Sequence, residues 1–407
     1  MLLIIAAGTV YPIPYLRQNF ENSLLELFGL TQAQLGQCNS LLGVMLFLTY
    51  LPSGWLADRV RPNWLLAASM AGTGALALVL ATAPGFFYIK VTYIALGLTT
   101  GLTLWASLIR TTSLIAPHSQ QGRFFGLLES GRGVIEALLA TLALGFFAYA
   151  IEQQTLATTV AASRVLIFYG LVALGLSPLV FFALSSPDKD SDPNAANSGS
   201  SLRWSDYKVL LSNPSIWLSA VVILVGYQMF WVTYSFAGLL ESIFGISAVT
   251  VGTITVARLW MRPISPVIAG VIGDKFHAVR FLALLLLIAA GMLAAIPLIP
   301  ANASVLVLLV MILAVSLVTF GIRGIYWATL DDCNVGASTR GMAVGIISIV
   351  AYTPDIYVPM IQAWCLSLWA GKAGYIAYYG IFSATGIIGC VAALKLANLS
   401  ERPHGEQ

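Results

Sequence analysis

Long apolar runs recur along the whole length of this 407-residue chain, separated by short charged or Gly/Pro-rich stretches. Hydrophobic residues make up 58% of the chain and charged residues only 9%, whereas soluble domains carry about 25% charged residues. This composition excludes an ordinary cytosolic enzyme, a disordered protein and a nucleic-acid binder. A membrane-spanning helix needs about 20 apolar residues, so the chain has room for twelve. We therefore expect an all-α membrane protein embedded in the lipid bilayer.

The apolar runs predict twelve spans in two sets of six. The first set covers 1–28, 34–57, 63–82, 86–110, 124–150 and 163–184, and the second covers 214–240, 248–272, 279–299, 303–327, 341–366 and 374–396. The expected domains are two six-helix bundles over 1–184 and 214–396, a cytoplasmic linker over 185–213 that is rich in Ser, Asp, Asn and Pro, and a cytoplasmic tail over 397–407.

The start of the chain has the features of a span and not those of a signal peptide. It lacks a basic n-region and a small-residue cleavage site. The first span begins abruptly, as a start codon placed too far downstream would explain.

The distribution of Lys and Arg orients the chain, because cytoplasmic loops carry an excess of these residues. With the amino terminus inside, the cytoplasmic residues are Arg59, Arg61, Arg110, Arg123, Lys189, Arg203, Lys208, Lys275, Arg280, Arg340, Lys395 and Arg402. The outer ones are Arg17, Lys90, Arg164 and Lys372. We expect both termini in the cytoplasm and a multi-pass protein of a bacterial inner membrane.

The two halves repeat one another. GWLADRVRP carries Asp58, and GVIGDKFH carries Asp274, 216 residues later. QGRFFG carries Arg123, and TRGMAVG carries Arg340, 217 residues later. Two landmarks at nearly one offset indicate a duplicated six-helix unit.

The loop from Gly54 to Arg61, with its copy from Gly270 to Lys275, resembles the signature loop of the major facilitator superfamily of secondary transporters. QQGRFFGLLESGRGVIE (120–136) with RGIYWATLDD (323–332) resembles a bacterial branch of it, distantly related to the organophosphate and organic-anion carriers. The resemblance covers essentially the whole chain. It implies two pseudo-symmetric six-helix bundles and transport by alternating access.

In that family such loops act as gate latches, which implies a gating set of Asp58, Arg59, Arg123, Asp274 and Arg340. An acid that closes one helix can accept hydrogen bonds from the amino end of another and pair with an arginine across the cytoplasmic face. The alternative is that these residues only fix topology and solvate a loop.

Charged residues inside the membrane are candidates for function, because burying them in hydrocarbon is expensive. Glu129, Arg132 and Glu136 are spaced to share one helix face, where Arg132 can bridge both carboxylates. They form either a closed structural cluster or a proton-coupling site in which Glu136 exchanges its proton. The resemblance places an acid, an arginine and a second acid here in the narrower branch as well.

Arg258 and Arg262 share one face of the span 248–272, which has no acidic residue near them. We expect them to line a cavity and bind an anion, since the guanidinium suits carboxylate, phosphate or sulfonate; the alternative is pairing with Asp355 or with backbone carbonyls. We expect Arg132 to bind the same anion as Arg258 and Arg262. Arg323 and Arg110 are expected to form a positively charged funnel at the cytoplasmic mouth of the cavity. The alternative for Arg323 is an ion pair with Asp331 or Asp332.

Asp355 follows a proline in YTPDIYVP, where Pro354 and Pro359 remove backbone donors and weaken the helix. A carboxylate there suits a hinge or a proton site, or a salt bridge to Arg258. The resemblance gives no acid at this position.

Two aromatic groups are candidates for substrate contact. The first lies in a broken helix that also contains Pro12 and Pro14, and the second is a stripe at helical spacing in the span 214–240 that more often reflects helix packing. The first group is Tyr11 and Tyr15 with Arg17, and the second is Tyr227, Trp231 and Tyr234.

Glycine pairs at 97–101 (GLTTG) and 341–345 (GMAVG) predict close helix packing. The four cysteines lack metal spacing, the three histidines fall in predicted loops or the tail, and no GxxxxGK[ST] motif occurs. We expect no cofactor, no metal and no enzyme activity.

The residues favour a monomeric secondary transporter that moves a small organic anion, such as a sugar acid, sugar phosphate or carboxylate, with proton coupling. The alternatives are a proton-driven multidrug exporter and a transporter-like receptor that senses a solute without moving it. The first is disfavoured by the absence of proline from 124 to 150 and by the basic candidate site, and the second by the presence of two latch loops.

Overall fold

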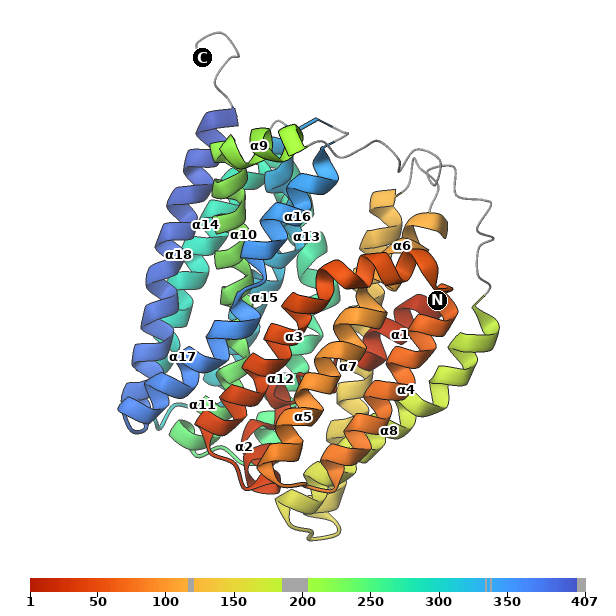
Figure 1. Cartoon of the computed structure of the whole chain (residues 1–407). Coiled ribbons are helices and arrows are strands. Elements are labelled where there is room, and N and C mark those ends of the chain that lie inside the picture. The colour runs from red at the N-terminus through yellow and green to blue at the C-terminus, as the bar shows by residue number, and fades with distance from the viewer. Residues whose placement is uncertain (116–120, 185–203, 334, 337–338, 401–407) are drawn as a thin grey trace. The chain divides into compact units, whose positions relative to one another are not determined.

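The computed structural model describes residues 1–115, 121–184, 204–333, 335–336 and 339–400 (Figure 1). These residues form helices joined by short connections, and no β-strand occurs among them. The all-α prediction is therefore confirmed. In the described part of the chain, nine helical stretches are long and apolar enough to cross a membrane. Twelve spans and cytoplasmic termini stay predictions.

The helices of the first half follow the predicted spans closely. They are α1 (Leu2–Val10), α2 (Arg17–Phe28), α3 (Gln32–Arg59), α4 (Pro62–Ala81), α5 (Phe86–Gly97), the π-helix η1 (Leu98–Trp105), α6 (Ala106–Ile115), α7 (Gln121–Glu152) and α8 (Thr158–Ala183).

A short helix, α9 (Trp204–Ser212), lies within the predicted linker. The helices of the second half are α10 (Pro214–Val232), η4 (Thr233–Ser235), α11 (Phe236–Phe244), α12 (Ala248–Leu259), α13 (Met261–Lys275), α14 (Ala278–Ala295), η5 (Ile296–Leu298), α15 (Val305–Ile325), η6 (Tyr326–Cys333), α16 (Arg340–Ala351), α17 (Pro354–Leu368) and α18 (Lys372–Ser400).

The chain forms two compact units, and neither is one continuous half of the sequence. Unit 1 comprises Met1–Ser198, Tyr234–Pro263 and Asp355–Ser367, and unit 2 comprises Gly199–Thr233, Ile264–Pro354 and Leu368–Gln407. Unit 1 thus combines the first half with α11, α12 and most of α17. The domains expected at 1–184 and 214–396 stay a prediction.

In unit 1, α4 and α8 cross closely because glycines remove the side chains between them. A Cβ atom on Gly74 would lie 2.8 Å from the carbonyl oxygen of Gly170, and a Cβ on Gly170 would lie 2.9 Å from that of Gly74. Such approaches bring helix backbones into van der Waals contact, which drives helix association in lipid. The adjoining core of unit 1 contains buried Phe20, Phe147 and Tyr169.

The predicted glycine pairs behave differently. A Cβ on Gly97 would lie 2.5 Å from the Cβ of Met45, and one on Gly101 would lie 2.1 Å from the hydroxyl of Thr49. The first pair therefore packs against α3 as expected. In the second pair, a Cβ on Gly345 would meet no atom within 4 Å, so the expectation of close packing is wrong for this glycine.

Unit 2 is built around α14 and α18, which pack against each other, while α10 packs against α18, α16 and α15. Gly386 of α18 lets that helix approach its neighbours, since a Cβ there would lie 2.7 Å from the Cβ of Ala290 and 2.5 Å from the Cε of Met229.

Several helical rods are interrupted within the described residues. Residues 11–16 form turns between α1 and α2, where Pro12 and Pro14 cannot donate helical hydrogen bonds. The π-helix η1 separates α5 from α6, and a similar break separates α16 from α17 just before Pro354. The breaks at 11–16 and before Pro354 agree with the sequence-based expectation. The π-helix had no signal in the sequence.

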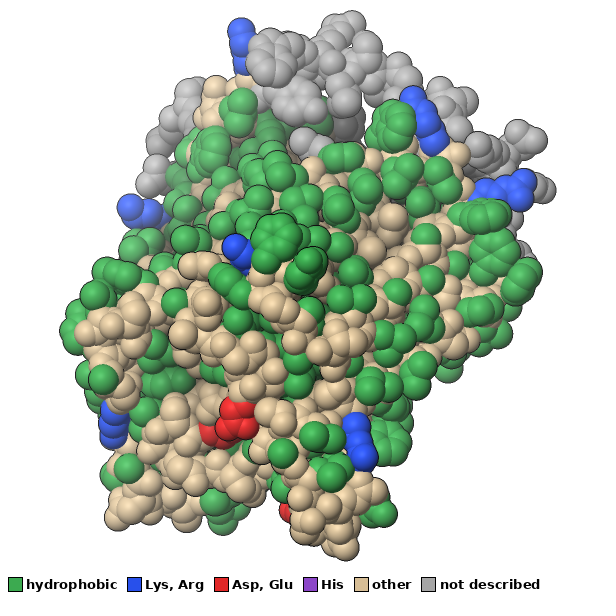
Figure 2. Space-filling model, turned by 60° about the horizontal axis from the view of Figure 1, so that its bottom comes forward, with side chains coloured by type: hydrophobic (Ala, Val, Ile, Leu, Met, Phe, Trp, Pro, Cys, Tyr) green, Lys and Arg blue, Asp and Glu red, His purple; other side chains and the backbone are tan. Residues whose placement is uncertain are grey.

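The outer surface is apolar, as a lipid environment requires. Figure 2 shows hydrophobic side chains over much of the visible face and few acidic or basic ones. Large exposed side chains include Phe182 and Leu142 in unit 1 and Leu306 and Ile388 in unit 2. Such exposure is unfavourable in water and favourable against lipid tails.

We predict that Gly170→Ala lowers the melting temperature of the detergent-purified protein, because its methyl group forces apart the α4 and α8 backbones. Gly175→Ala, on the same helix, is the matched control, since a Cβ there meets nothing within 4 Å. Equal melting temperatures for the two variants would contradict the close crossing.

Candidate functional site

Polar side chains are concentrated at the start of α2, directly after the turns at 11–16 that separate it from α1. Arg17, Gln18, Asn19 and Glu21 are each at most 3% exposed. A second irregularity follows at Phe20, whose φ of −137° and ψ of 39° are not helical. Successive residues of a helix point about 100° apart, so neighbouring polar residues of α2 face different helices. α2 packs against α8, α11 and α12.

The first group of contacts, called here the Glu136 network, consists of Glu136, Arg262, Gln18 and Arg258. Arg262 Nη1 donates to Glu136 Oε2 and forms an ion pair with it. Gln18 Nε2 donates to Glu136 Oε1 over 3.4 Å. Arg258 Nη2 donates to Gln18 Oε1 over 3.0 Å. The network joins α7, α2, α12 and the start of α13 entirely within unit 1.

The pair between Arg262 and Glu136 depends on local packing. Gly133, one turn before Glu136, has no side chain, and a Cβ there would lie 3.1 Å from the Cγ of Arg262. The methylene groups of the Arg262 side chain therefore pass along α7, and the guanidinium reaches the carboxylate of Glu136. This pair corrects the expectation that Arg262 has no acid nearby, which is wrong because the acid, Glu136, lies on another helix, α7.

Arg132 pairs with the other acid of its helix. Its Nη2 donates to Glu129 Oε2 over 2.7 Å, and its guanidinium lies over the Tyr11 ring at 4.9 Å. Arg132 is 2% exposed, whereas the Glu129 side chain is 46% exposed. The sequence predicts that Arg132 bridges Glu129 and Glu136. In the structure Arg132 pairs with Glu129, whereas Glu136 pairs with Arg262 of α13.

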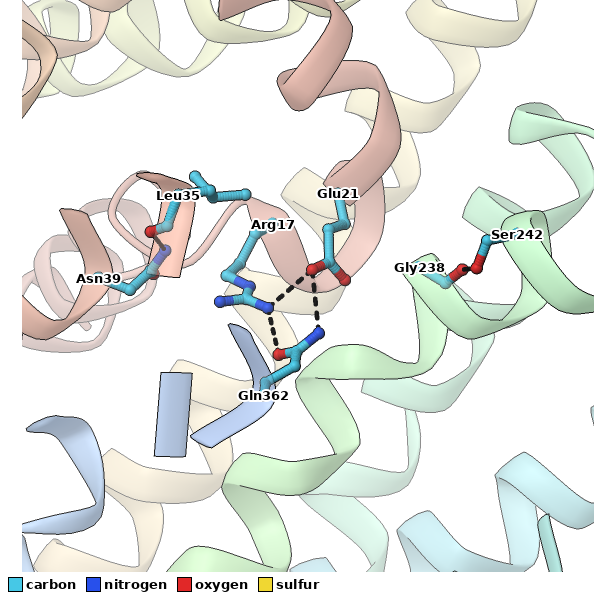
Figure 3. A network of polar contacts seen from close by, with 7 residues as sticks. All are labelled: Arg17, Glu21, Leu35, Asn39, Gly238, Ser242 and Gln362. Carbon is cyan, nitrogen blue, oxygen red and sulfur yellow. Dashed lines mark hydrogen bonds and ion pairs between the residues drawn. The ribbon is translucent and has the colours of Figure 1, made fainter. Parts of the chain in front are cut away.

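A second group, called here the Arg17 cluster, consists of Arg17, Glu21 and Gln362 (Figure 3). Arg17 Nη2 lies 2.8 Å from Glu21 Oε1 and donates to Gln362 Oε1 over 2.5 Å. Gln362 Nε2 in turn donates to Glu21 Oε1 over 3.1 Å. One amide of α17 thus bonds both members of a buried ion pair on α2.

Aromatic rings surround Arg258. Its guanidinium lies 5.7 Å from the Tyr234 ring centre and 6.0 Å from that of Phe236. Tyr15 packs edge-on against Tyr234 at 5.7 Å, and Asp355 lies near Tyr15. Cation–π contacts hold a desolvated guanidinium in place. Tyr15 and Tyr234, predicted from different spans, therefore lie together in unit 1.

The other predicted aromatic residues belong to unit 2. Tyr227 packs edge-on against Tyr352 at 5.0 Å, and the guanidinium of Arg323 lies 4.5 Å from the Phe230 ring and 5.6 Å from the Tyr227 ring. Trp231 is 2% exposed on the same helix. The expected stripe is divided because α10 ends at Val232 and Tyr234 lies in η4.

Two further predicted residues are placed by the backbone. Asp355 is 3% exposed in the first turn of α17, where the helix dipole favours a carboxylate. Its carbonyl oxygen would lie 2.4 Å from a Cβ on Gly43, so α3 and α17 meet closely here. Arg110 of α6 donates to the backbone carbonyl of Ala57.

Most of the predicted gate lies beyond what the structure describes. The side chains of Asp58, Arg123 and Arg340 are outside the described residues. Arg59 is exposed and lies 4.1 Å over the Trp55 ring, and Asp274 is exposed at the end of α13. The latch therefore stays a prediction.

Sequence reasoning missed Gln18, Glu21, Gln362 and Tyr169. Glu21 had a usable signal, because an acid four residues after an arginine predicts an intrahelical pair. The two glutamines stand in apolar spans, where amides commonly hydrogen-bond between helices. Tyr169 of α8 is fully buried, lies near Glu136 and had no signal in the sequence.

The chemistry available here is the exchange of partners between guanidinium and carboxylate groups. Arginine only donates and an ionised carboxylate only accepts, so an anion can replace a carboxylate on an arginine. Among the described residues, no group of three or more His, Cys, Asp or Glu side chains is arranged to hold a metal ion.

We predict that Glu21→Gln lowers the free energy of unfolding by about 3–5 kcal/mol, because it leaves the Arg17 guanidinium buried without a carboxylate. The double variant Arg17→Met with Glu21→Leu restores most of the loss, since apolar residues of similar volume replace a buried pair at little cost. Thermal unfolding in detergent measures both, with the exposed Glu26→Gln as control. Equal melting temperatures for Glu21→Gln and Glu26→Gln would contradict the buried pair.

Comparison with known proteins gives one family. The sequence profile of the Major Facilitator Superfamily matches residues 1–359. The chain is 24% identical to the inner membrane protein YihN of Escherichia coli K12, covering 98% of this chain and 95% of that protein. It is 27% identical to the inner membrane protein YqcE of the same organism, covering 91% and 88%.

Solved structures agree in fold. The nucleoside transporter NupG superposes with a TM-score of 0.69 at 14% identity, covering 99% of this chain and 98% of that one. A bacterial homologue of the human lysosomal transporter Spinster, facing inward and unoccupied, gives 0.69 at 14% identity, covering 98% and 95%. The chain is thus a multi-pass inner-membrane transporter and not an enzyme, and it belongs to the Major Facilitator Superfamily.

Proposed function

We propose that this chain is a monomeric secondary transporter that moves a small organic anion by alternating access and couples this movement to a proton. The substrate class is a sugar acid, a sugar phosphate or another carboxylate. The proposal rests on one observation, the buried pair of Arg262 and Glu136 with its extension through Gln18 to Arg258.

The support comes from partner exchange and not from a surplus of positive charge, because Arg17, Arg132 and Arg262 each pair with a carboxylate. A proton on Glu136 removes the charge that Arg262 faces. A substrate carboxylate or phosphate then takes over the guanidinium, whose planar fork accepts it in a bidentate manner. Proton and anion therefore enter the site together with no net change in its charge.

The energies are compatible with this exchange. Removing one partner from a buried ion pair costs about 3–5 kcal/mol. Hydrogen bonds to charged groups contribute about 1.5–3 kcal/mol each, so an anion held by two of them offsets the loss. An uncharged solute lacks this compensation, which favours an anionic substrate over a neutral one.

The positions of the partners in the sequence support alternating access. Glu136 and Gln18 belong to the first half, whereas Arg258 and Arg262 belong to the second. Rocking of one half against the other would break the Arg262–Glu136 and Arg258–Gln18 contacts, which join the two halves, and substrate binding would control when they break. We propose that Asp58, Arg123, Asp274, Arg340 and the adjacent Arg59 latch the cytoplasmic side in the same cycle.

Among the candidate proton carriers, Glu136 has the strongest support. It is 4% exposed and pairs directly with an arginine of the proposed anion site. Glu129 is half-exposed, so its ionisation is tied less closely to the site. Asp355 is buried beside Tyr15 and is the second candidate.

We predict that Glu136→Gln abolishes pH-driven anion accumulation in proteoliposomes and preserves counterflow exchange, because the amide cannot carry a proton but still leaves Arg262 available. The matched control is Glu152→Gln, an exposed acid at the end of the same helix. A pH dependence of uptake equal to that of the wild type would reject Glu136 as the carrier.

We also predict that gluconate, glucose 6-phosphate or lactate raises the melting temperature of the purified protein, since binding stabilises the folded state. Arg258→Ala abolishes this shift and the corresponding uptake, while the exposed Arg164→Ala retains both. If none of the three anions, each representing one substrate class, raises the melting temperature, the proposed anion class is wrong.

A further inference from the structure

Gln18 is the one neutral member of the Glu136 network, and it contacts charged side chains from two other helices. It is 2% exposed and lies on α2 between Glu136 of α7 and Arg258 of α12. We infer that Gln18 is a positioning residue that couples protonation of Glu136 to anion binding at Arg258. This inference rests on the proposed function and adds a residue and a mechanism to it.

The orientation of the Gln18 amide is dictated by its partners. A guanidinium has only donors, and an ionised carboxylate has only acceptors. The amide must therefore present its oxygen to Arg258 and its nitrogen to Glu136, as the structure has it. No other orientation satisfies both charged groups, so the ionised state of Glu136 keeps an acceptor in front of Arg258.

A proton on Glu136 reverses this requirement. The carboxylic acid gains an O–H donor, and the amide oxygen of Gln18 becomes its natural acceptor. The terminal torsion of a glutamine has a broad, two-fold profile, so the amide turns over without moving α2. Its NH₂ group then faces Arg258, and two donors cannot bond each other. Arg258 loses the acceptor that Gln18 supplied and takes an oxygen of the substrate anion instead.

The proposed change of protonation takes place on Glu136 and not on the charged and titratable groups around it. They are Arg262 of α13, Arg258 of α12, Tyr169 of α8 and, one turn earlier on its own helix, Arg132. The other helices packed on α7 are α1, which has no ionisable side chain, and α6, whose Arg110 bonds Ala57. Guanidinium groups stay charged throughout the physiological range.

The coupling is reciprocal by thermodynamic necessity. Protonation of Glu136 raises anion affinity, and a bound anion favours the protonated acid. Two routes contribute, one directly through Arg262 and one through the Gln18 amide to Arg258. Removing the amide leaves the first route intact, so the effect of Gln18 is separable from that of Glu136.

The test measures the dissociation constants of gluconate, glucose 6-phosphate and lactate at acidic and neutral pH for the full-length protein. In the wild type, affinity rises on acidification. In Gln18→Leu, the ratio of the two affinities shrinks about tenfold, the size of one hydrogen bond to a charged group. In Glu136→Gln, the ratio becomes one. Gln362→Leu is the matched control, because it removes an equally buried amide from the Arg17 cluster and leaves the ratio unchanged.

A second readout needs no substrate. The infrared difference spectrum between acidic and neutral pH contains a glutamine carbonyl band that is lost in both Gln18→Leu and Glu136→Gln and kept in Gln362→Leu. A wild-type affinity ratio that persists in full in Gln18→Leu, or a band that survives there, overturns the inference and leaves the proposed function standing. Absence of anion binding by the wild type at either pH overturns both.

Discussion

A buried carboxylate held by a guanidinium, between Glu136 of α7 and Arg262 of α13, is the interaction on which the other features of the site depend. In an apolar environment each charge needs the other, because an uncompensated buried ion is strongly destabilising. The pair draws Gln18 and, through it, Arg258 into one network. The Arg262–Glu136 and Arg258–Gln18 contacts each join the first half of the sequence to the second, which is why the proposed transport cycle assigns them a role.

The breaks in the helices explain how so many polar groups are accommodated. The turns at 11–16 and the irregular backbone of Phe20 flank the start of α2, where Arg17 and Glu21 contact Gln362 of α17 and Gln18 contacts Glu136 of α7 and Arg258 of α12. Irregular backbone is tolerated in membrane proteins where it is enclosed by other helices.

The sequence predicted the helical architecture and the break at Pro12 and Pro14, because hydropathy and missing backbone donors are local properties. It also identified Glu136, Arg258 and Arg262 as membrane-embedded charges. It did not predict their pairing, since Glu136 and Arg262 lie 126 positions apart and no local pattern joins them. The amides of Gln18 and Gln362 were missed for a related reason, because a glutamine in an apolar span indicates a functional role only when its charged partners are known.

The adjacent positions of Arg17 and Gln18 have a consequence for how this helix can vary. The two side chains serve separate networks only because successive residues point about 100° apart around a helix axis. One residue inserted or deleted between Gln18 and Glu21 would shift Glu21 by about that angle away from Arg17 and from Gln362. The spacing of these residues along α2 is therefore under stricter constraint than the identity of the residues between them, and homologous chains that keep both networks should keep it.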